Sequence, residues 1–147
     1  MAEYLMGIDA GTGSVRVALF DFRGHNRAYA VAEYGTTYPK NGWAEQSDYE
    51  WFEALKKAIP ECIKKAGIAA DNIAAITCDA TTNTLVYLDE NDTSVRPPIL
   101  WMDVRATEEA SFIDTIREEY DATKFYKPGF RADTMVPKCM WVKKNEP

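Results

Sequence analysis

The sequence is poor in the residues that most metal, disulfide and nucleophilic sites require. It contains a single histidine, His25, and three widely spaced cysteines without a C-x-x-C pair. A Ser-His or Cys-His catalytic pair is therefore not expected, and carboxylates are the natural acid/base groups. The odd number of cysteines argues against a disulfide framework or a zinc site, so we expect Cys62, Cys78 and Cys139 to be buried free thiols.

The chain also lacks excess positive charge and long apolar runs. Its formal net charge of −6 argues against nucleic acid as a partner. No apolar run approaches the roughly 18 residues of a membrane span, and no basic segment precedes an apolar one at the start, so neither a membrane protein nor a secretory signal is indicated. With 147 residues, 46% of them hydrophobic, we expect a globular domain in the cytoplasm.

One stretch near the N-terminus, residues 5–21, organises the rest of the chain. An apolar run ends at Asp9, a Gly/Thr/Ser turn follows, and residues 15–20 alternate with period two, which predicts strand, tight turn, strand. Gly11 and Gly13 allow positive φ or close approach of a ligand, and the turn's N–H groups and hydroxyls can hold an oxyanion. A carboxylate beside bound phosphate implies a cation, most simply hydrated Mg²⁺ at Asp9.

Two other phosphate motifs do not fit this stretch. A P-loop requires a lysine after its glycines, and a dinucleotide fingerprint requires glycines that open a helix. Here no lysine follows Gly13, and the next residues have the period of a strand. The remaining alternative is an ordinary glycine hairpin with a solvated Asp9.

A long amphipathic helix is predicted over residues 47–66. Ser47 and Glu50 have the spacing of a capping box, Pro60 predicts a kink or a brief break, and Gly67 predicts the end. Its inward stripe comprises Trp51, Leu55, Ala58, Ile59, Cys62, Ile63 and Ala66.

The other elements follow from shorter patterns. A third antiparallel strand is predicted over 27–34 and a fourth, buried strand over 73–78. Further strands are expected at 85–89 and 97–100, with helices over 107–120 and 137–147. The fold class is therefore α/β, with three antiparallel strands followed by alternating helix and strand.

Several motifs resemble those of a known superfamily. Residues 9–16, followed by an apolar strand ending in Asp21, resemble the first phosphate motif of the actin, Hsp70 and sugar-kinase superfamily, whose domain is ribonuclease-H-like. Residues 42–46 are similar to "GWxEQ", residues 97–106 to "PxxLWxDxRA" and residues 137–147 to "PKxxWxxxNEP". These later segments are typical of the FGGY carbohydrate kinases of ribulokinase and xylulokinase type.

The resemblance implies an activity for the whole protein. Residues 1–147 would be the N-terminal part of the first kinase domain, without the remainder of that domain or the second, ATP-binding domain. The protein would use ATP and Mg²⁺ to phosphorylate a small sugar, a ketopentose of the ribulose or xylulose type or a related polyol. The general-base aspartate is expected beyond Pro147, so no catalytic residue is assigned within the chain. The chain alone is expected to be inactive, and the full-length protein to be a homodimer.

The same resemblance implies roles in phosphate binding. Asp9 would hold Mg²⁺ through water. The ATP phosphates would be bound by Gly11, Thr12, Gly13 and Arg16. Thr12 and Gly13 would line their path, and Arg16 would neutralise or organise charge near the turn. The alternative for Arg16 is a surface ion pair with Asp9 or Asp21.

For the substrate, the resemblance points to Thr82, Asn83, Trp101 and Asp103. At the first two positions xylulose kinases typically have Met-His and glycerol kinases Arg-Glu, so Thr-Asn departs from both. The preceding Asp-Ala-Thr is more similar to ribulokinases, and amide and hydroxyl groups suit sugar hydroxyls. The alternative is structural, with Trp101 in the core and Asp103 as a helix N-terminal charge.

Other functions remain open. The chain could be a non-catalytic sugar-binding or interaction module of the same fold, or part of a kinase for a signalling ketose. An assembly ATPase of the actin or Hsp70 type is disfavoured by residues 97–106. For Trp43 and Gln46, packing of their loop is favoured over a functional role.

Overall fold

The structure is a computed structural model that describes residues 3–119 and 129–147. The chain forms two compact units, which are described separately. The first comprises Met1–Gly35 and Ser47–Thr81, and the second comprises Thr36–Gln46 and Thr82–Pro147.

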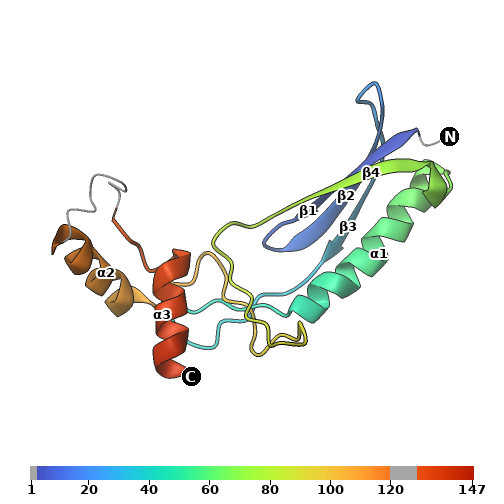
Figure 1. The fold of residues 1–147 in the computed structure, drawn as a ribbon. Coiled ribbons are helices and arrows are strands. Elements are labelled where there is room, and N and C mark those ends of the chain that lie inside the picture. The colour runs from blue at the N-terminus through green and yellow to red at the C-terminus, as the bar shows by residue number, and fades with distance from the viewer. Residues whose placement is uncertain (1–2, 120–128) are drawn as a thin grey trace. The chain divides into compact units, whose positions relative to one another are not determined.

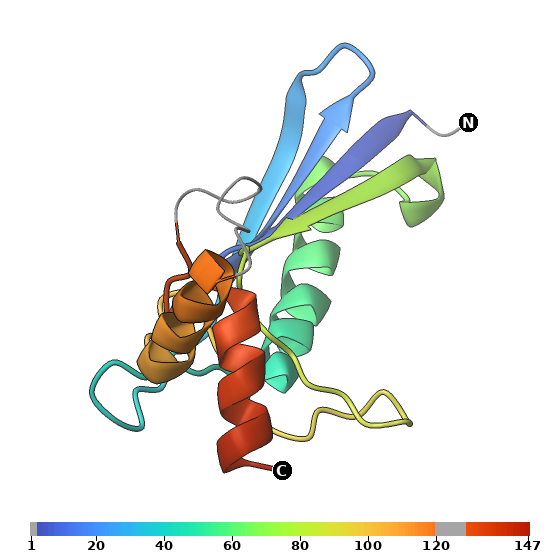
Figure 2. The same cartoon turned by 60° about the vertical axis from the view of Figure 1, so that its left-hand side comes forward.

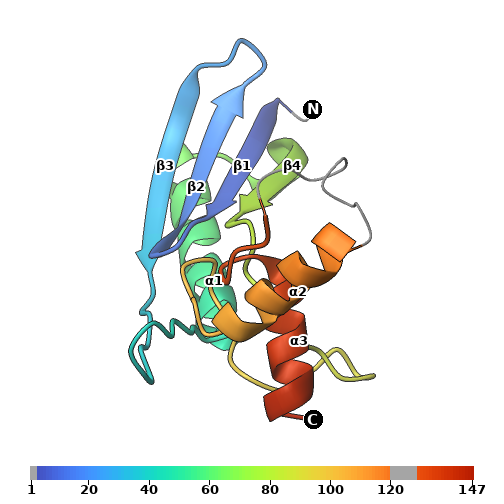
Figure 3. The same cartoon turned by 90° about the vertical axis from the view of Figure 1, so that its left-hand side faces the viewer.

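The first unit is built on a sheet with strand order β3-β2-β1-β4, as Figure 3 shows. Its strands are β1 (Tyr4–Ala10), β2 (Ser14–Asp21), β3 (Asn26–Glu33) and β4 (Ile73–Ala80). The first three pair antiparallel through short turns, and β4 returns parallel to β1. This confirms the predicted order of three antiparallel strands, a helix and a further strand.

Helix α1 (Asp48–Ala66) packs on one face of this sheet (Figure 1). The strand residues facing it alternate with residues on the opposite face, as period two requires. On the helix side the most buried residues are small and spaced four apart, which lets the helix lie close to the strands. The core comprises Met6, Ile8, Val15, Val17, Leu19, Ala28, Ala30, Ala54, Ala58 and Cys62. The predicted stripe therefore missed Ala54, while Leu55, Ile59, Ile63 and Ala66 pack at its margin.

The two ends of α1 differ from each other in how well they were predicted. Ser47 is the N-cap, but its side chain makes no capping hydrogen bond, so the predicted capping box is wrong. Glu50 N–H donates instead to the Ser47 carbonyl. Pro60 lies inside the helix without interrupting it. Gly67 ends the helix as predicted, with a left-handed φ of 67° that an L side chain would strain.

Strand β4 differs from the prediction of a buried strand. A short 3-10 turn, η1 (Ala70–Asn72), leads into it, and seven of its eight residues are exposed. The reason is its place in the sheet. Among the described residues β4 pairs only with β1, and α1 packs mainly on β2 and β3.

The second unit contains helices α2 (Thr107–Glu119) and α3 (Met135–Asn145), which pack against each other (Figure 2). The last residue predicted for the first of these helices, Tyr120, lies outside the described residues. Both helices were otherwise predicted within a few residues. The strands predicted at 85–89 and 97–100 are wrong, because these segments form only isolated bridges. These are Leu85 with Ile99, Glu45 with Ile99 and Leu88 with Ser94.

The three cysteines are free, as expected, but only Cys62 is buried. Cys78 lies on the exposed strand β4 and Cys139 on the exposed side of α3. The expectation of buried thiols is therefore wrong for these two. None of the helices within the described ranges has the length and apolarity needed to span a bilayer.

Candidate functional site

Asp9 and Arg16 face each other where the first hairpin turns. They are a register pair of the β1–β2 ladder, and Arg16 Nη1 donates to Asp9 Oδ2 at 2.7 Å. Their side chains are 45% and 48% exposed, so both groups are accessible to a ligand. The hydrogen bond to Asp9, together with its negative charge, raises the pKa of Arg16. The ends of β1 and β2 at this turn thus present a carboxylate and a permanently charged guanidinium.

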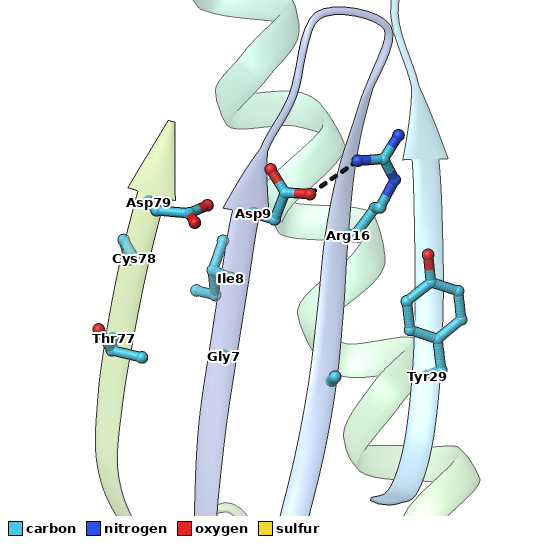
Figure 4. Close-up of a pocket in the computed structure, with 9 residues that line it drawn as sticks. Gly7, Ile8, Asp9, Arg16, Tyr29, Thr77, Cys78 and Asp79 are labelled. Carbon is cyan, nitrogen blue, oxygen red and sulfur yellow. Dashed lines mark hydrogen bonds and ion pairs between the residues drawn. The ribbon is translucent and has the colours of Figure 1, made fainter. Parts of the chain in front are cut away.

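Asp79 adds a second carboxylate, to which sequence analysis assigned no role. It is the parallel register partner of Asp9, and Figure 4 shows both side chains on the same face of the sheet. Asp9, Arg16, Tyr29 and Asp79 contribute to the lining of a pocket of about 330 Å³. The sequence did contain a signal for this proximity. Each aspartate lies next to the carboxyl end of its strand, and the carboxyl ends of parallel strands meet at one edge of the sheet.

These two carboxylates suit a particular kind of cation. No group of three or more histidine, cysteine or acidic side chains capable of holding a metal ion occurs within residues 3–119 and 129–147. Asp9 and Asp79 together carry two negative charges and Arg16 one positive charge, so the pocket is net negative. Two carboxylate ligands are the number typical of a Mg²⁺ ion that keeps most of its water.

The turn after Asp9 is held in place by Tyr34. Gly11 N–H donates to the Ser14 carbonyl at 3.0 Å, and Tyr34 donates from its hydroxyl to the Gly11 carbonyl and from its N–H to the Gly13 carbonyl. Burial, followed by the charge of Asp9, raises the pKa of the Tyr34 phenol. Because a trans peptide points its C=O and N–H in opposite directions, the Thr12 N–H is directed away from the Tyr34 hydroxyl.

The two turn glycines do not adopt positive φ, which removes one of the two reasons predicted for them. A Cβ on Gly13 would meet nothing within 4 Å, whereas one on Gly11 would lie 3.1 Å from Arg16 Nη1. Gly11 therefore leaves room for the Arg16 side chain. The fold itself does not require Gly13, so close approach of a ligand remains the reason predicted for it.

In the second unit, Thr82 and Asn83 form a turn. Asn83 has a φ of 55°, a left-handed conformation that asparagine tolerates better than most residues. Trp101 lies in a second turn and is 43% exposed, so the alternative that it is a core residue is not supported. Both turns present polar or aromatic side chains of the kinds that contact sugars.

Asp103 occupies a different environment from Trp101. It is completely buried, and both of its carboxylate oxygens accept hydrogen bonds. Oδ2 accepts from Ala44 N–H and Arg105 Nη2, both at 2.7 Å, and Oδ1 accepts from Arg105 N–H and Nε. Both carboxylate oxygens therefore already bind the 42–46 loop and Arg105.

Arg105 is the centre of a buried ionic cluster. Its side chain has no exposed surface and also donates to Glu45 Oε1 at 2.8 Å, which in turn pairs with Arg96. Burial by itself lowers the pKa of Arg105, but the hydrogen bonds and charges of Asp103 and Glu45 raise it on balance. Sequence reasoning missed this cluster because Glu45 lies 60 residues from Arg105 and 51 from Arg96.

Two tryptophans enclose the same guanidinium. The Arg105 Cζ lies 3.9 Å from the centre of the Trp43 ring and 5.1 Å from that of Trp141. The two rings meet edge to face. This agrees with a packing role for Trp43, and Gln46 likewise is buried and donates to Thr36 Oγ1.

Lys138 is a further residue that the sequence did not single out. Its side chain is completely buried, and Nζ donates to the Leu100 carbonyl at 2.7 Å and the Asn83 carbonyl at 3.1 Å. Burial lowers the pKa of this amine to about 8. Lys138 thereby joins the Thr82–Asn83 turn to the turn that carries Trp101.

The predicted residues therefore form two groups, one in each unit. Asp9, Gly11 and Arg16 meet at the turn of the first unit. In the second unit, Lys138 links the turns that carry Asn83 and Trp101, while Asp103 is buried in the ionic cluster.

Comparison with known proteins gives a consistent result. The chain is 34% identical over 146 residues to a xylulose kinase of Staphylococcus epidermidis and 32% identical over 120 residues to a glycerol kinase of Rhizobium meliloti. These matches cover 99% and 81% of this chain, and 28% and 24% of the relatives. The chain therefore spans less than a third of the length of these relatives.

Solved structures share the fold. A "xyloylose kinase" from Brucella ovis matches with a TM-score of 0.88 and 28% identity over 96% of this chain and 29% of that one. A glycerol kinase of Plasmodium falciparum, solved with ADP, matches with a TM-score of 0.83 at 20% identity over 98% of this chain and 29% of that one, which shows likeness of fold. The sequence profile of the FGGY carbohydrate kinases, N-terminal domain, matches residues 4–147. The chain belongs to the FGGY family of carbohydrate kinases and contains sequence of their N-terminal domain.

Proposed function

We propose that the protein containing this chain transfers the γ-phosphoryl group of ATP to a hydroxyl group of a small sugar or polyol. The substrate that we propose is a ketopentose of the ribulose or xylulose type or a related polyol. The observation that carries this proposal is the accessible Asp9–Arg16 pair beside a glycine turn, in a chain of the FGGY family. Phosphoryl transfer requires mainly positioning and neutralisation of charge, which such groups supply.

In the first unit, the turn and its flanking charges form the proposed phosphate site. Gly11, Thr12 and Gly13 line the path of the phosphates, and Arg16 balances their negative charge. Asp9, together with Asp79, would hold a hydrated Mg²⁺. When bound there, Mg²⁺ supplies neutralisation of phosphate charge.

In the second unit, Thr82, Asn83 and Trp101 form the proposed sugar contacts. Their hydroxyl and amide groups suit hydrogen bonding to sugar hydroxyls, and the exposed ring of Trp101 offers an apolar face for sugar carbons. Asp103 acts as a positioning residue, because its carboxylate oxygens are occupied by Ala44 and Arg105.

The reaction balances without a covalent intermediate on this chain. The sugar oxygen forms the new bond to the γ-phosphorus while the bond between that phosphorus and ADP breaks. The hydroxyl proton passes to a general base, which we expect to be an aspartate beyond Pro147. Arg16 and the turn stabilise charge on the phosphoryl oxygens during transfer.

The test is an ADP-release assay on the product of the uninterrupted reading frame that contains this chain. The substrates are ribulose, xylulose, fuculose, erythritol, ribitol and glycerol. We expect turnover with at least one of them, and a loss of about 100-fold or more in kcat for Asp9→Asn. Asp71→Asn, an exposed carboxylate on η1, serves as the control and should retain activity. Absence of turnover with every sugar would reject the kinase proposal and favour a binding module.

The 147-residue chain by itself is expected to consume no ATP in a sugar-dependent manner, since the proposed general base lies outside it. Purified chain, assayed under the same conditions as the longer protein, tests this point. Measurable sugar-dependent turnover would place the base within the chain.

A further inference from the structure

Lys138 is unusual because a charged side chain of its length is completely buried without a carboxylate in contact. Lys138 appears in none of the ion pairs found among the described residues, and Nζ donates to two backbone carbonyls instead, those of Asn83 and Leu100. Burial of an amine in this way is costly, which is why the pKa of Lys138 falls. An apolar side chain of similar volume would fill the same space at lower cost.

The two acceptors belong to the two turns of the proposed sugar site. Asn83 lies in a turn with a left-handed φ of 55°, and its carbonyl accepts a hydrogen bond from Lys138 Nζ at 3.1 Å. Leu100 directly precedes Trp101, and its carbonyl also accepts from Asp103 N–H at 3.1 Å, which closes the turn around Trp101. One ammonium group on α3 therefore bridges residues 17 positions apart in the sequence.

The alternative for Lys138 is a purely structural tie. The rest of the unit already provides such ties, since Leu85 and Ile99 exchange backbone hydrogen bonds at 2.9 Å next to these turns. Leu100 N–H also donates to the Ala44 carbonyl at 3.0 Å. What Lys138 adds is the direct link from the Asn83 carbonyl to the Leu100 carbonyl.

We infer that Lys138 is a positioning residue for sugar recognition, which sets the spacing between Asn83 and Trp101 through its two hydrogen bonds. This inference rests on the proposed function. It extends that function by naming a residue that contacts no sugar itself and yet determines how well a sugar of given length fits between the two contacts. A displacement of about 1 Å takes a hydrogen bond of roughly 2.8 Å beyond hydrogen-bonding distance, so a shift of this size between Asn83 and Trp101 would weaken sugar binding.

The test compares Lys138→Met and Lys138→Gln in the product of the uninterrupted reading frame. The two replacements have similar length, but only glutamine retains N–H donors. For the sugar that supports turnover, we expect Lys138→Met to raise the sugar KM at least about tenfold, with the ATP KM within about twofold of the original. Lys138→Gln should be intermediate. Lys143→Met, at an exposed position of the same helix, should leave both KM values unchanged.

The outcomes separate this inference from the proposed function. A sugar KM that stays unchanged in both Lys138 variants, with only less active protein or a lower Tm, overturns the positioning role and leaves the kinase proposal intact. If Lys138→Met does not fold, an unchanged sugar KM in Lys138→Gln overturns it equally. If the unaltered protein phosphorylates none of the sugars, the proposed function fails and this inference fails with it.

Discussion

Asp9 Oδ2 accepts a hydrogen bond from Arg16 Nη1 at 2.7 Å, directly across the β1–β2 ladder. Because both groups are about half exposed, the pair contributes little to folding. Its main effect is to hold a carboxylate and a guanidinium in a defined orientation at the turn.

Replacement of Arg16 by glutamine should separate the contribution of the ion pair to stability from its contribution to activity. We expect the free energy of unfolding to change by less than about 1 kcal/mol, since exposed ion pairs are weak, while kcat/KM for ATP falls at least about tenfold. The matched control is Lys56→Gln, which removes another exposed ion pair, with Glu53 at 2.7 Å. Urea unfolding and initial-rate kinetics provide the measurements. An Arg16 variant with normal kinetics would assign the pair a surface role only.

Gly13 offers a test of close ligand approach at the turn. A Cβ there would meet nothing within 4 Å, so Gly13→Ala should leave the stability of the fold nearly unchanged. In the kinase, the added methyl group should raise the KM for ATP if phosphate lies against the turn. Gly35→Ala, which also meets nothing within 4 Å, is the control. Equal ATP KM values for both variants would contradict the phosphate site.

Asp103 should matter mainly for stability. Asp103→Ala leaves the Arg105 guanidinium buried beside Trp43 with one of its carboxylate partners removed. Breaking a buried ion pair typically costs about 3–5 kcal/mol in the free energy of unfolding. Urea unfolding followed by tryptophan fluorescence suits the measurement, because Trp43 and Trp141 both lie against Arg105. A loss below about 1 kcal/mol would mean that Glu45 alone satisfies Arg105.

Lys138 should make stability depend on pH in the alkaline range. Its pKa is lowered from 10.5 to about 8 by burial, with Asp103 and Asp133 acting in the opposite direction and Arg105 in the same direction. Between these pH values the unfolded chain binds more protons than the folded one, so this residue's contribution to stability rises with pH. Below pH 8 its burial penalty is fully present.

Lys138→Met removes this dependence. We expect the difference in unfolding free energy between the original protein and the variant to shift in favour of the original from pH 8 to pH 10. Urea unfolding at pH 7, 8, 9 and 10 measures it, with Lys143→Met as the control. A difference that is constant over this range would show that the amine titrates normally.

Local sequence patterns determined the first unit well. Period-two alternation after Asp9 specified β2, and Gly67 specified the end of α1, because strand alternation and a left-handed cap depend only on neighbouring residues. The same reasoning failed at Ser47, where the backbone supplied the hydrogen bond instead of the side chain. It also failed for β4, whose apolar residues gave no information on which face a helix would cover.

The sequence by itself thus determined the hairpin, its Asp9 and glycine turn, and the motifs that assign the family. Only the tertiary structure decided that Asp79 lies beside Asp9, that the Asp103 carboxylate accepts hydrogen bonds from Arg105, and that Lys138 joins the turns of Asn83 and Trp101. The hairpin, its turn and the family motifs each depend on residues that are close together in the chain. The contacts of Asp79 and Lys138 join residues that are tens of positions apart, and Asp103 is enclosed by the equally distant 42–46 loop, so folding alone brings these groups together.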